Sequence, residues 1–162
     1  MITVEDHLRR CLDAVAPLEP LELALLEAQD CVLAEDVVSP LDLPGFDNSA
    51  MDGYAVTAAD VEGIDESSPV RLPVVADVPA GTTHQARLVP GQAVRIMTGG
   101  PMPAGAEAVV PVEDSDGGIR EVELRASVPA GRHVRKAGSD VRAGDLVLRA
   151  GTQLGPAQLA LL

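Results

Sequence analysis

The spacing of hydrophobic residues predicts a helix near the start of the chain. Between residues 4 and 15 the apolar side chains fall three or four positions apart, as on one face of an amphipathic helix. Thr3 precedes this segment as an N-cap, and Pro17 follows it as a helix breaker. The next stretch, residues 21–28, is ambiguous, because its residues favour helix while its leucines also alternate as in a strand.

The rest of the chain shows mainly the pattern of short β-strands. The β-branched pair Val37–Val38 predicts a short strand, and apolar residues alternate with polar ones across residues 70–78 and 94–96. A short apolar run follows at residues 109–112, and residues 119–128 follow the turn sequence Asp-Gly-Gly at 116–118. The tripeptide Pro-Ala-Gly occurs three times and predicts turns, since proline presets one backbone angle and glycine tolerates the next.

These patterns predict a mainly β protein with a few helices, in the α+β class, built as two domains. Residues 40–139 are expected to form a β domain of short, irregular strands, while residues 1–39 and 140–162 pack together as a small mixed domain. A second helix is predicted to begin at Gly155, the N-cap before a proline. Its sequence stops without a polar tail, so we expect a piece of a longer protein.

Composition and charge narrow the classes of partner. The 162-residue chain is 46% hydrophobic but holds one Phe, one Tyr and no Trp, so its core must be built from aliphatic side chains. The formal net charge of −13 argues against nucleic acid or a membrane as the main partner, since such a surface repels phosphates. No signal peptide is visible, and no apolar run approaches the ~18 residues of a membrane span.

The cysteines and histidines indicate no metal site. Cys11 and Cys31 form no C-x-x-C pair and are expected to be free, buried thiols in a reducing cytoplasm. His7, His84 and His133 are far apart in the sequence and show no metal-ligand spacing, so each is expected at the surface.

The segment FDNSAMDGYAV, residues 46–56, concentrates candidate chemistry. It carries Phe46 and Tyr54, the two aromatic residues of the chain. Two carboxylates, Asp47 and Asp52, could hold a divalent cation or act as acid and base. The alternative is ordinary loop chemistry, in which Asp and Asn side chains bond their own backbone and the rings fix the loop to the core. An apolar Ala-Met pair between the rings favours a loop held rigid against a partner.

A second segment, RIMTGGPMPAGAEAVVPVE at residues 95–113, contains a glycine-rich bend after a strand. Thr98 and the two glycines that follow it could offer a hydroxyl and free amides to an oxyanion, or simply end the strand as a turn. The bend is not a Walker A loop, because no lysine follows it and Pro101 removes an amide donor.

A third segment, residues 135–154, forms a basic patch within an otherwise acidic chain. The patch contains Arg135, Lys136 and Arg142 together with the neighbouring Arg132. These side chains could hold an anion or neutralise neighbouring acidic surface, and the second role is the commoner one.

Together, the three segments resemble the N-terminal region of one family. The chain contains, in the family's order and separations, PLDLPGFDNSAMDGYAV, RIMTGGPMPAGAEAVV and RKAGSD-V-x-x-G-D-x-x-L-x-x-G-T-x-L. The family is MoeA, the molybdopterin molybdenumtransferases, to which the E domain of gephyrin belongs. The resemblance covers practically the whole chain. It implies a bifurcated, extended β domain inserted in the small mixed domain, two further domains beyond Leu162, and a homodimer.

The resemblance also implies an enzyme of molybdenum cofactor biosynthesis in the cytoplasm. Members of the family insert molybdate into adenylylated molybdopterin, release AMP and require Mg²⁺. This region would supply a dimerisation surface and loops that complete the partner subunit's active cleft, so alone it is expected to be inactive. Other proteins of the molybdenum cofactor pathway are candidate partners.

Position by position, the resemblance implies roles for residues of the first two segments. Asp52 and Thr98 match functionally implicated positions and are the candidate catalytic residues. Asp52 could hold Mg²⁺ or position water, and Thr98 could bond a phosphate or molybdate oxygen. Gly100 stands where alanine is more usual. The remaining candidates for the substrate loop are Asp47, Asn48, Ser49, Gly53 and Gly99.

Two other functions stay open on the sequence. The chain could be a non-catalytic dimerisation and interaction module, since gephyrin's E domain also serves in receptor anchoring. Such a module would self-associate with little dependence on Asp52. The chain could also be an acidic anion- or metal-binding β module unrelated to cofactor synthesis.

Overall fold

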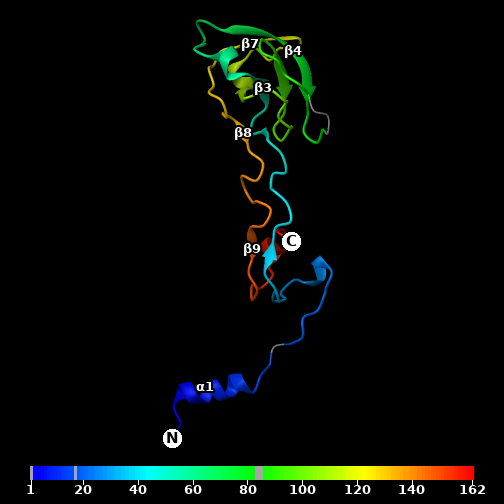
Figure 1. The fold of residues 1–162 in the computed structure, drawn as a ribbon, viewed down its shortest axis with the longest axis vertical. Coiled ribbons are helices and arrows are strands. Elements are labelled where there is room, and N and C mark those ends of the chain that lie inside the picture. The colour runs from blue at the N-terminus through cyan, green and yellow to red at the C-terminus, as the bar shows by residue number, and fades with distance from the viewer. Residues whose placement is uncertain (1, 17, 83–85) are drawn as a thin grey trace. The chain divides into compact units, whose positions relative to one another are not determined.

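The structure, a computed structural model, describes residues 2–16, 18–82 and 86–162. The chain divides into two compact units, Met1–Val38 with Leu146–Leu162 and Ser39–Asp145. Figure 1 follows the chain from blue at the N-terminus to red at the C-terminus.

The larger unit, Ser39–Asp145, is built around a β-sheet (Figure 1). Its strands are β3 (Gly53–Val56), β4 (Val70–Val78), β5 (Ala93–Ile96), β6 (Ala108–Pro111) and β7 (Glu121–Leu124). Among the described residues these five strands take the order β6-β3-β5-β4-β7. Neighbouring strands are antiparallel except β4 and β5, which run parallel.

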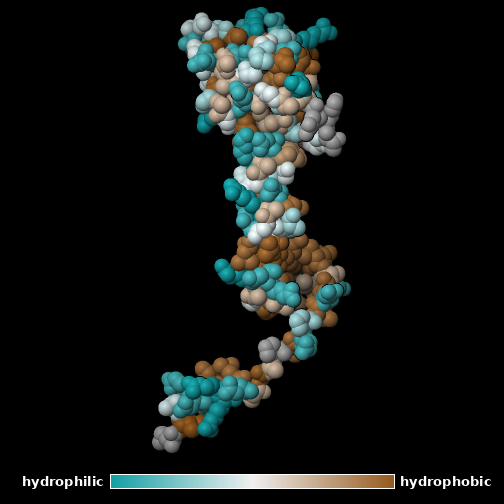
Figure 2. Space-filling view, in the orientation of Figure 1, coloured by the Kyte–Doolittle hydropathy of each residue, from teal (hydrophilic) through white to brown (hydrophobic). Residues whose placement is uncertain are grey.

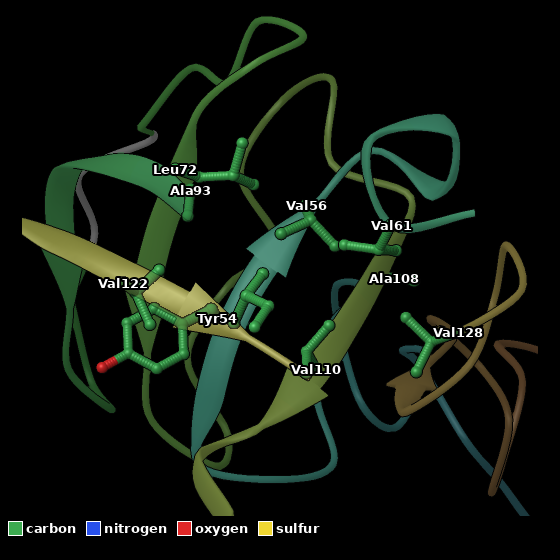
Figure 3. Packing of buried hydrophobic residues seen from close by; sticks show 10 residues of the cluster. Tyr54, Val56, Val61, Leu72, Ala93, Ala108, Val110, Val122 and Val128 are labelled. Carbon is green, nitrogen blue, oxygen red and sulfur yellow. The ribbon is translucent and has the colours of Figure 1, made fainter. Parts of the chain in front are cut away.

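Apolar side chains cover both faces of this sheet. One cluster surrounds Tyr54, whose ring lies beside Val122 (Figure 3), and the other gathers around Val94 and Ile96. Because both faces are covered, every residue of the interior strand β3 is buried and its apolar residues need not alternate. Along β4, which is also an interior strand, burial alternates as predicted for residues 70–78.

Short elements connect the sheet to the rest of this unit. They are β2 (Asn48–Ser49), η2 (Ala58–Val61), η3 (Val112–Asp114) and β8 (Val134–Arg135), of which β2 and β8 pair antiparallel. The three Pro-Ala-Gly segments are turns, as predicted: Gly81, Gly105 and Gly131 have φ angles of 78°, 94° and 82°. Only glycine adopts such angles without strain, so turn chemistry explains the recurrence.

The smaller unit contains both predicted helices. Helix α1 (Val4–Asp13) is capped by the Thr3 hydroxyl, which accepts the Asp6 backbone N–H at 3.1 Å. Helix α2 (Pro156–Leu159) has Gly155 as its N-cap, and both predictions are therefore confirmed. Pro17 lies outside the described residues. Among the residues that the structure describes, no helix has the length and apolar character needed to cross a membrane.

Two further elements of the smaller unit can be compared with the sequence, which left residues 21–28 ambiguous and predicted a strand at Val37–Val38. The stretch 21–28 contains a single 3₁₀ turn, η1 (Leu25–Glu27), in place of a full helix or strand. Strand β1 (Val37–Val38) forms as predicted and pairs antiparallel with β9 (Leu146–Leu148).

The expectation of buried thiols is wrong. Cys11 and Cys31 are free, but both are exposed. Cys11 lies on α1, none of whose residues is buried, and its Sγ is 3.9 Å from the His7 Nε2. His133 is partly buried with a φ of 58°, and His84 lies outside the described residues.

The two aromatic rings differ in burial. Tyr54 is fully buried in β3, and its hydroxyl donates to the Gly118 carbonyl oxygen at 2.9 Å. Burial raises the pKa of this hydroxyl, which therefore stays protonated and can donate. Phe46 is 51% exposed. The prediction that both rings fix the loop is thus wrong for Phe46, which precedes β2 and belongs to neither core cluster.

Tyr54→Phe is expected to lower the free energy of unfolding by about 1 kcal/mol, because it removes one buried hydrogen bond. Phe46→Leu is the control and should change it by less than about 0.5 kcal/mol, since the ring is half exposed. Chemical denaturation followed by circular dichroism measures both. Equal losses in the two variants would contradict the role of Tyr54 as the anchoring ring.

Candidate functional site

The three segments singled out in the sequence meet at strand β2. On one edge, Gly99 N–H donates to the Ser49 carbonyl at 2.8 Å, and Ser49 N–H donates to the Gly100 carbonyl at 3.0 Å. On the other edge β2 pairs with β8, and the Ala50 N–H donates to the His133 carbonyl at 2.9 Å. Main-chain hydrogen bonds therefore join segments that are far apart in the sequence.

Asp52 and Thr98 are in direct contact. One oxygen of Asp52, Oδ1, accepts from the Thr98 backbone N–H at 2.6 Å and from its hydroxyl at 2.7 Å. The contact follows from the antiparallel pairing of β3 and β5, in which Gly53 lies opposite Ile96. Asp52 directly precedes β3 and Thr98 closely follows β5, so the two meet at the same edge of the sheet. Both residues are exposed.

The glycines around this contact serve different purposes. A Cβ on Gly53 would collide with the backbone of Val110 on β6, so the close pairing of β3 and β6 requires glycine. Gly99 adopts a φ of 79° with open space around it. At Gly100 a Cβ would lie 2.9 Å from two backbone carbonyl oxygens, so alanine at this position would force the bend or β4 to shift.

The contact with Thr98 lowers the pKa of the Asp52 carboxyl below its ordinary value. The largest cause is the backbone N–H of Thr98, the hydroxyl is the second, and the positive charge of Arg95 adds to them. Asp52 is therefore ionised at neutral pH. Its second oxygen, Oδ2, accepts no hydrogen bond from any residue that the structure describes, and it is available to a proton donor or a cation.

The backbone amides of the glycine-rich bend are not available to a ligand. The Thr98 N–H donates to Asp52, and the N–H groups of Gly99 and Gly100 donate to backbone carbonyls. The prediction of free amides for an oxyanion is therefore wrong, because strand pairing and turn closure use all three. The pair offers acceptor oxygens instead, from the carboxylate and from the threonine hydroxyl.

The other candidates of this loop bond within the protein. Asp47 accepts from the Lys136 Nζ at 2.7 Å and from the Ala137 N–H at 2.9 Å, and these bonds, that to Lys136 first, lower the pKa of its carboxyl. Asn48 and Ser49 are buried, and their side chains donate to carbonyl oxygens of the same loop at 3.1 and 2.5 Å. These contacts are the ordinary loop chemistry that the sequence left open.

Part of the basic segment neutralises acidic neighbours. Lys136 pairs with Asp47, and Arg135 pairs with Asp140 at 2.6 Å. Sequence reasoning missed the Lys136–Asp47 pair because the two residues are 89 positions apart. It also assigned no role to Arg95, although the sequence places this charged residue between two apolar ones in a predicted strand, which sets it apart from its neighbours.

A complete metal site is absent from the described residues, which contain no group of three or more His, Cys, Asp or Glu placed to hold an ion. Asp52 by itself offers a single exposed carboxylate oxygen, Oδ2, that accepts no hydrogen bond from a described residue. Mg²⁺ is commonly held by one or two carboxylates together with waters and substrate phosphates. Asp52 therefore fits one ligand position of such an ion.

Thr98→Val is expected to raise the pKa of Asp52 part of the way to its ordinary value, because the hydroxyl donor is lost while the backbone donor stays. The lowered pKa stabilises the fold above the unfolded-state pKa, and this contribution is lost as pH falls through the folded-state pKa. Carboxyl titration by NMR measures the shift. Asp65, which is held by Ser67 and Ser68, is the internal control and should not move. An unchanged pKa of Asp52 would contradict this account of the contact.

The chain is similar to known proteins over nearly its whole length. Residues 2–162 match the family described as "MoeA N-terminal region (domain I and II)". "Molybdopterin molybdenumtransferase 2" of Mycobacterium tuberculosis (strain ATCC 25618 / H37Rv) is 48% identical over 161 residues, which is 99% of this chain and 40% of the relative. "Molybdopterin molybdenumtransferase" of Synechococcus elongatus is 42% identical over 91% of this chain and 37% of the relative.

A solved structure agrees with the fold. The crystal structure of the molybdopterin biosynthesis moeA protein from Pyrococcus horikoshii OT3 matches with a TM-score of 0.89 and 35% identity, over 97% of this chain and 42% of that one. The chain thus spans about two fifths of the length of the relatives it matches. The expected mainly β fold is confirmed, and the chain belongs to the MoeA family, whose N-terminal region it matches.

Proposed function

We propose that this chain is the N-terminal region of a molybdopterin molybdenumtransferase, which inserts molybdate into adenylylated molybdopterin and releases AMP. The relatives carry that enzyme name, and their greater length leaves room for the domains that would complete the enzyme. The observation that carries the proposal is the exposed Asp52–Thr98 contact at the edge of the sheet. This region then contributes dimerisation surface and half of a cleft, and alone it is inactive.

Asp52 is the catalytic residue of this half-site. Its Oδ1 is fixed by two donors of Thr98, so the carboxylate keeps one orientation without losing its charge. The free Oδ2 accepts a proton from water or holds Mg²⁺ next to the substrate. When bound there, Mg²⁺ would supply Lewis-acid stabilisation of charge on a phosphate oxygen. Thr98 positions the carboxylate, since its hydroxyl proton is directed to Asp52.

Helix α1 supports the proposal of a homodimer. Its apolar stripe includes Val4, Leu8 and Leu12, and Val15 lies just past its end; these side chains are 81, 57, 63 and 71% exposed. Figure 2 shows hydrophobic surface along this helix. A helix of 10 residues is not stable in water without such a face being covered. The same stripe favours the second candidate function, a non-catalytic interaction module.

The cellular context follows from the same proposal. Two exposed, unpaired cysteines suit a reducing cytoplasm. Proteins that supply adenylylated molybdopterin or receive the finished cofactor are the candidate partners of the enzyme.

Asp52→Ala in the longer protein is expected to lower the rate of molybdenum insertion by about 10²-fold or more, the usual contribution of a positioned acid or base. Asp65→Ala is the matched control, because Asp65 is also an exposed carboxylate with a lowered pKa but lies in a turn before β4. Insertion is measured by reconstitution of a molybdoenzyme, with melting temperatures as the check on folding. Full activity of Asp52→Ala would refute the catalytic proposal and leave the interaction module.

Leu8→Glu with Leu12→Glu is expected to abolish self-association of the 162-residue chain, because two charges would enter the apolar stripe. Arg9→Gln with Arg10→Gln changes the net charge equally on the polar face and should leave association intact. Light scattering across the micromolar range measures both. A monomeric unmodified chain would contradict the assignment of α1 to the dimer surface.

A further inference from the structure

Arg95 lies on the sheet next to the Asp52–Thr98 contact. It faces Tyr54 across β3 and β5, and it faces Asp77 across β4 and β5. Residues directly opposite on neighbouring strands carry their side chains on the same face. The Tyr54–Arg95 pair lies next to the Gly53–Ile96 pair, beyond which Asp52 and Thr98 meet.

The guanidinium of Arg95 is only weakly engaged by the protein. Its Nη1 lies 3.5 Å from the Asp77 Oδ2, at the limit of a hydrogen bond. Among the described residues, the guanidinium forms no other hydrogen bond or ion pair. The two side chains are 36% and 55% exposed, so water screens the pair. A guanidinium has five N–H donors, which leaves most of them free for a ligand.

Two basic side chains near the loop have full partners. Lys136 donates to Asp47 at 2.7 Å, and Arg135 donates to Asp140 at 2.6 Å. Within the described chain, Arg95 is the basic residue whose charge acts on the Asp52 carboxylate. Its charge is thus only weakly committed to the protein, and it lies beside Asp52.

Such a cation suits the proposed reaction. Molybdate and the phosphates of adenylylated molybdopterin are oxoanions, and the ionised Asp52 repels them. The bend cannot compensate, because its backbone amides are used within the protein. An arginine fork matches a tetrahedral oxoanion through two parallel hydrogen bonds, which a lysine does not.

We propose that Arg95 binds a tetrahedral oxoanion, a substrate phosphate or molybdate, beside Asp52. The inference rests on the proposed function and adds a substrate-binding residue to it. The long, exposed contact with Asp77 gives way when the oxoanion binds.

Arg95→Gln in the longer protein is expected to raise the KM for the bound oxoanion about tenfold or more, the loss typical of a charged hydrogen bond, with a smaller effect on kcat. The KM of Arg95→Lys should lie between those of the unmodified protein and of Arg95→Gln, because lysine keeps the charge but loses the forked pair of donors. Separate titrations of molybdate and of adenylylated molybdopterin distinguish the sources: the substrate whose KM rises is the one that Arg95 binds.

Two controls separate binding from structure. Arg71→Gln removes an ion pair to Glu123 on β4 and β7 of the same sheet and should leave both KM values unchanged. Asp77→Asn removes the partner but keeps Arg95, and it should change KM far less than Arg95→Gln. Melting temperatures of all variants report on folding.

The outcomes are distinct. Unchanged KM values in Arg95→Gln, with Asp52→Ala inactive, overturn the role of Arg95 and leave the proposed function standing. An equal rise of KM in Asp77→Asn and Arg95→Gln overturns it as well, because the ion pair and not the free donors would then matter. Activity in Asp52→Ala refutes the proposed function itself.

Discussion

The pairing of strand β2 on both edges is the constraint on which the candidate site depends. Two residues, Asn48 and Ser49, are buried between the bend after β5 and strand β8. A slip of one residue would turn their side chains to the opposite faces and break the bonds that close the loop. With the register fixed, the side chains of Asn48 and Ser49 form hydrogen bonds within the loop, and Asp52 stays exposed at the end of the loop.

Features that depend on neighbours in the sequence could be predicted. The Thr3 cap of α1, the glycine turns and the alternation along β4 follow from a few adjacent residues each. The parallel pairing of β4 with β5 and the junction at β2 depend on segments far apart, so no local pattern indicated them. For the same reason the resemblance named Asp52 and Thr98 without explaining their contact, which comes from the register of β3 and β5.

The two carboxylates of the loop show how one segment separates structural from chemical roles. Both have lowered pKa values, but the partners differ. Asp47 is bound by a lysine, so its charge is cancelled and it serves as a tie between β2 and the segment after β8. Asp52 is bound by an amide and a hydroxyl, which are neutral, so its negative charge remains at the surface. Sequence composition treats the two residues alike.

The distance of 89 residues between Asp47 and Lys136 also sets the time at which the loop forms during synthesis. Chains leave the ribosome from the N-terminus, and long-range pairing must wait for the later partner. Until β8 has emerged, β2 lacks one of its two pairing partners and Asp47 lacks its lysine. Asp52 can meet Thr98 earlier, because β3 and β5 both precede β8, so the acidic loop would be fixed in two steps.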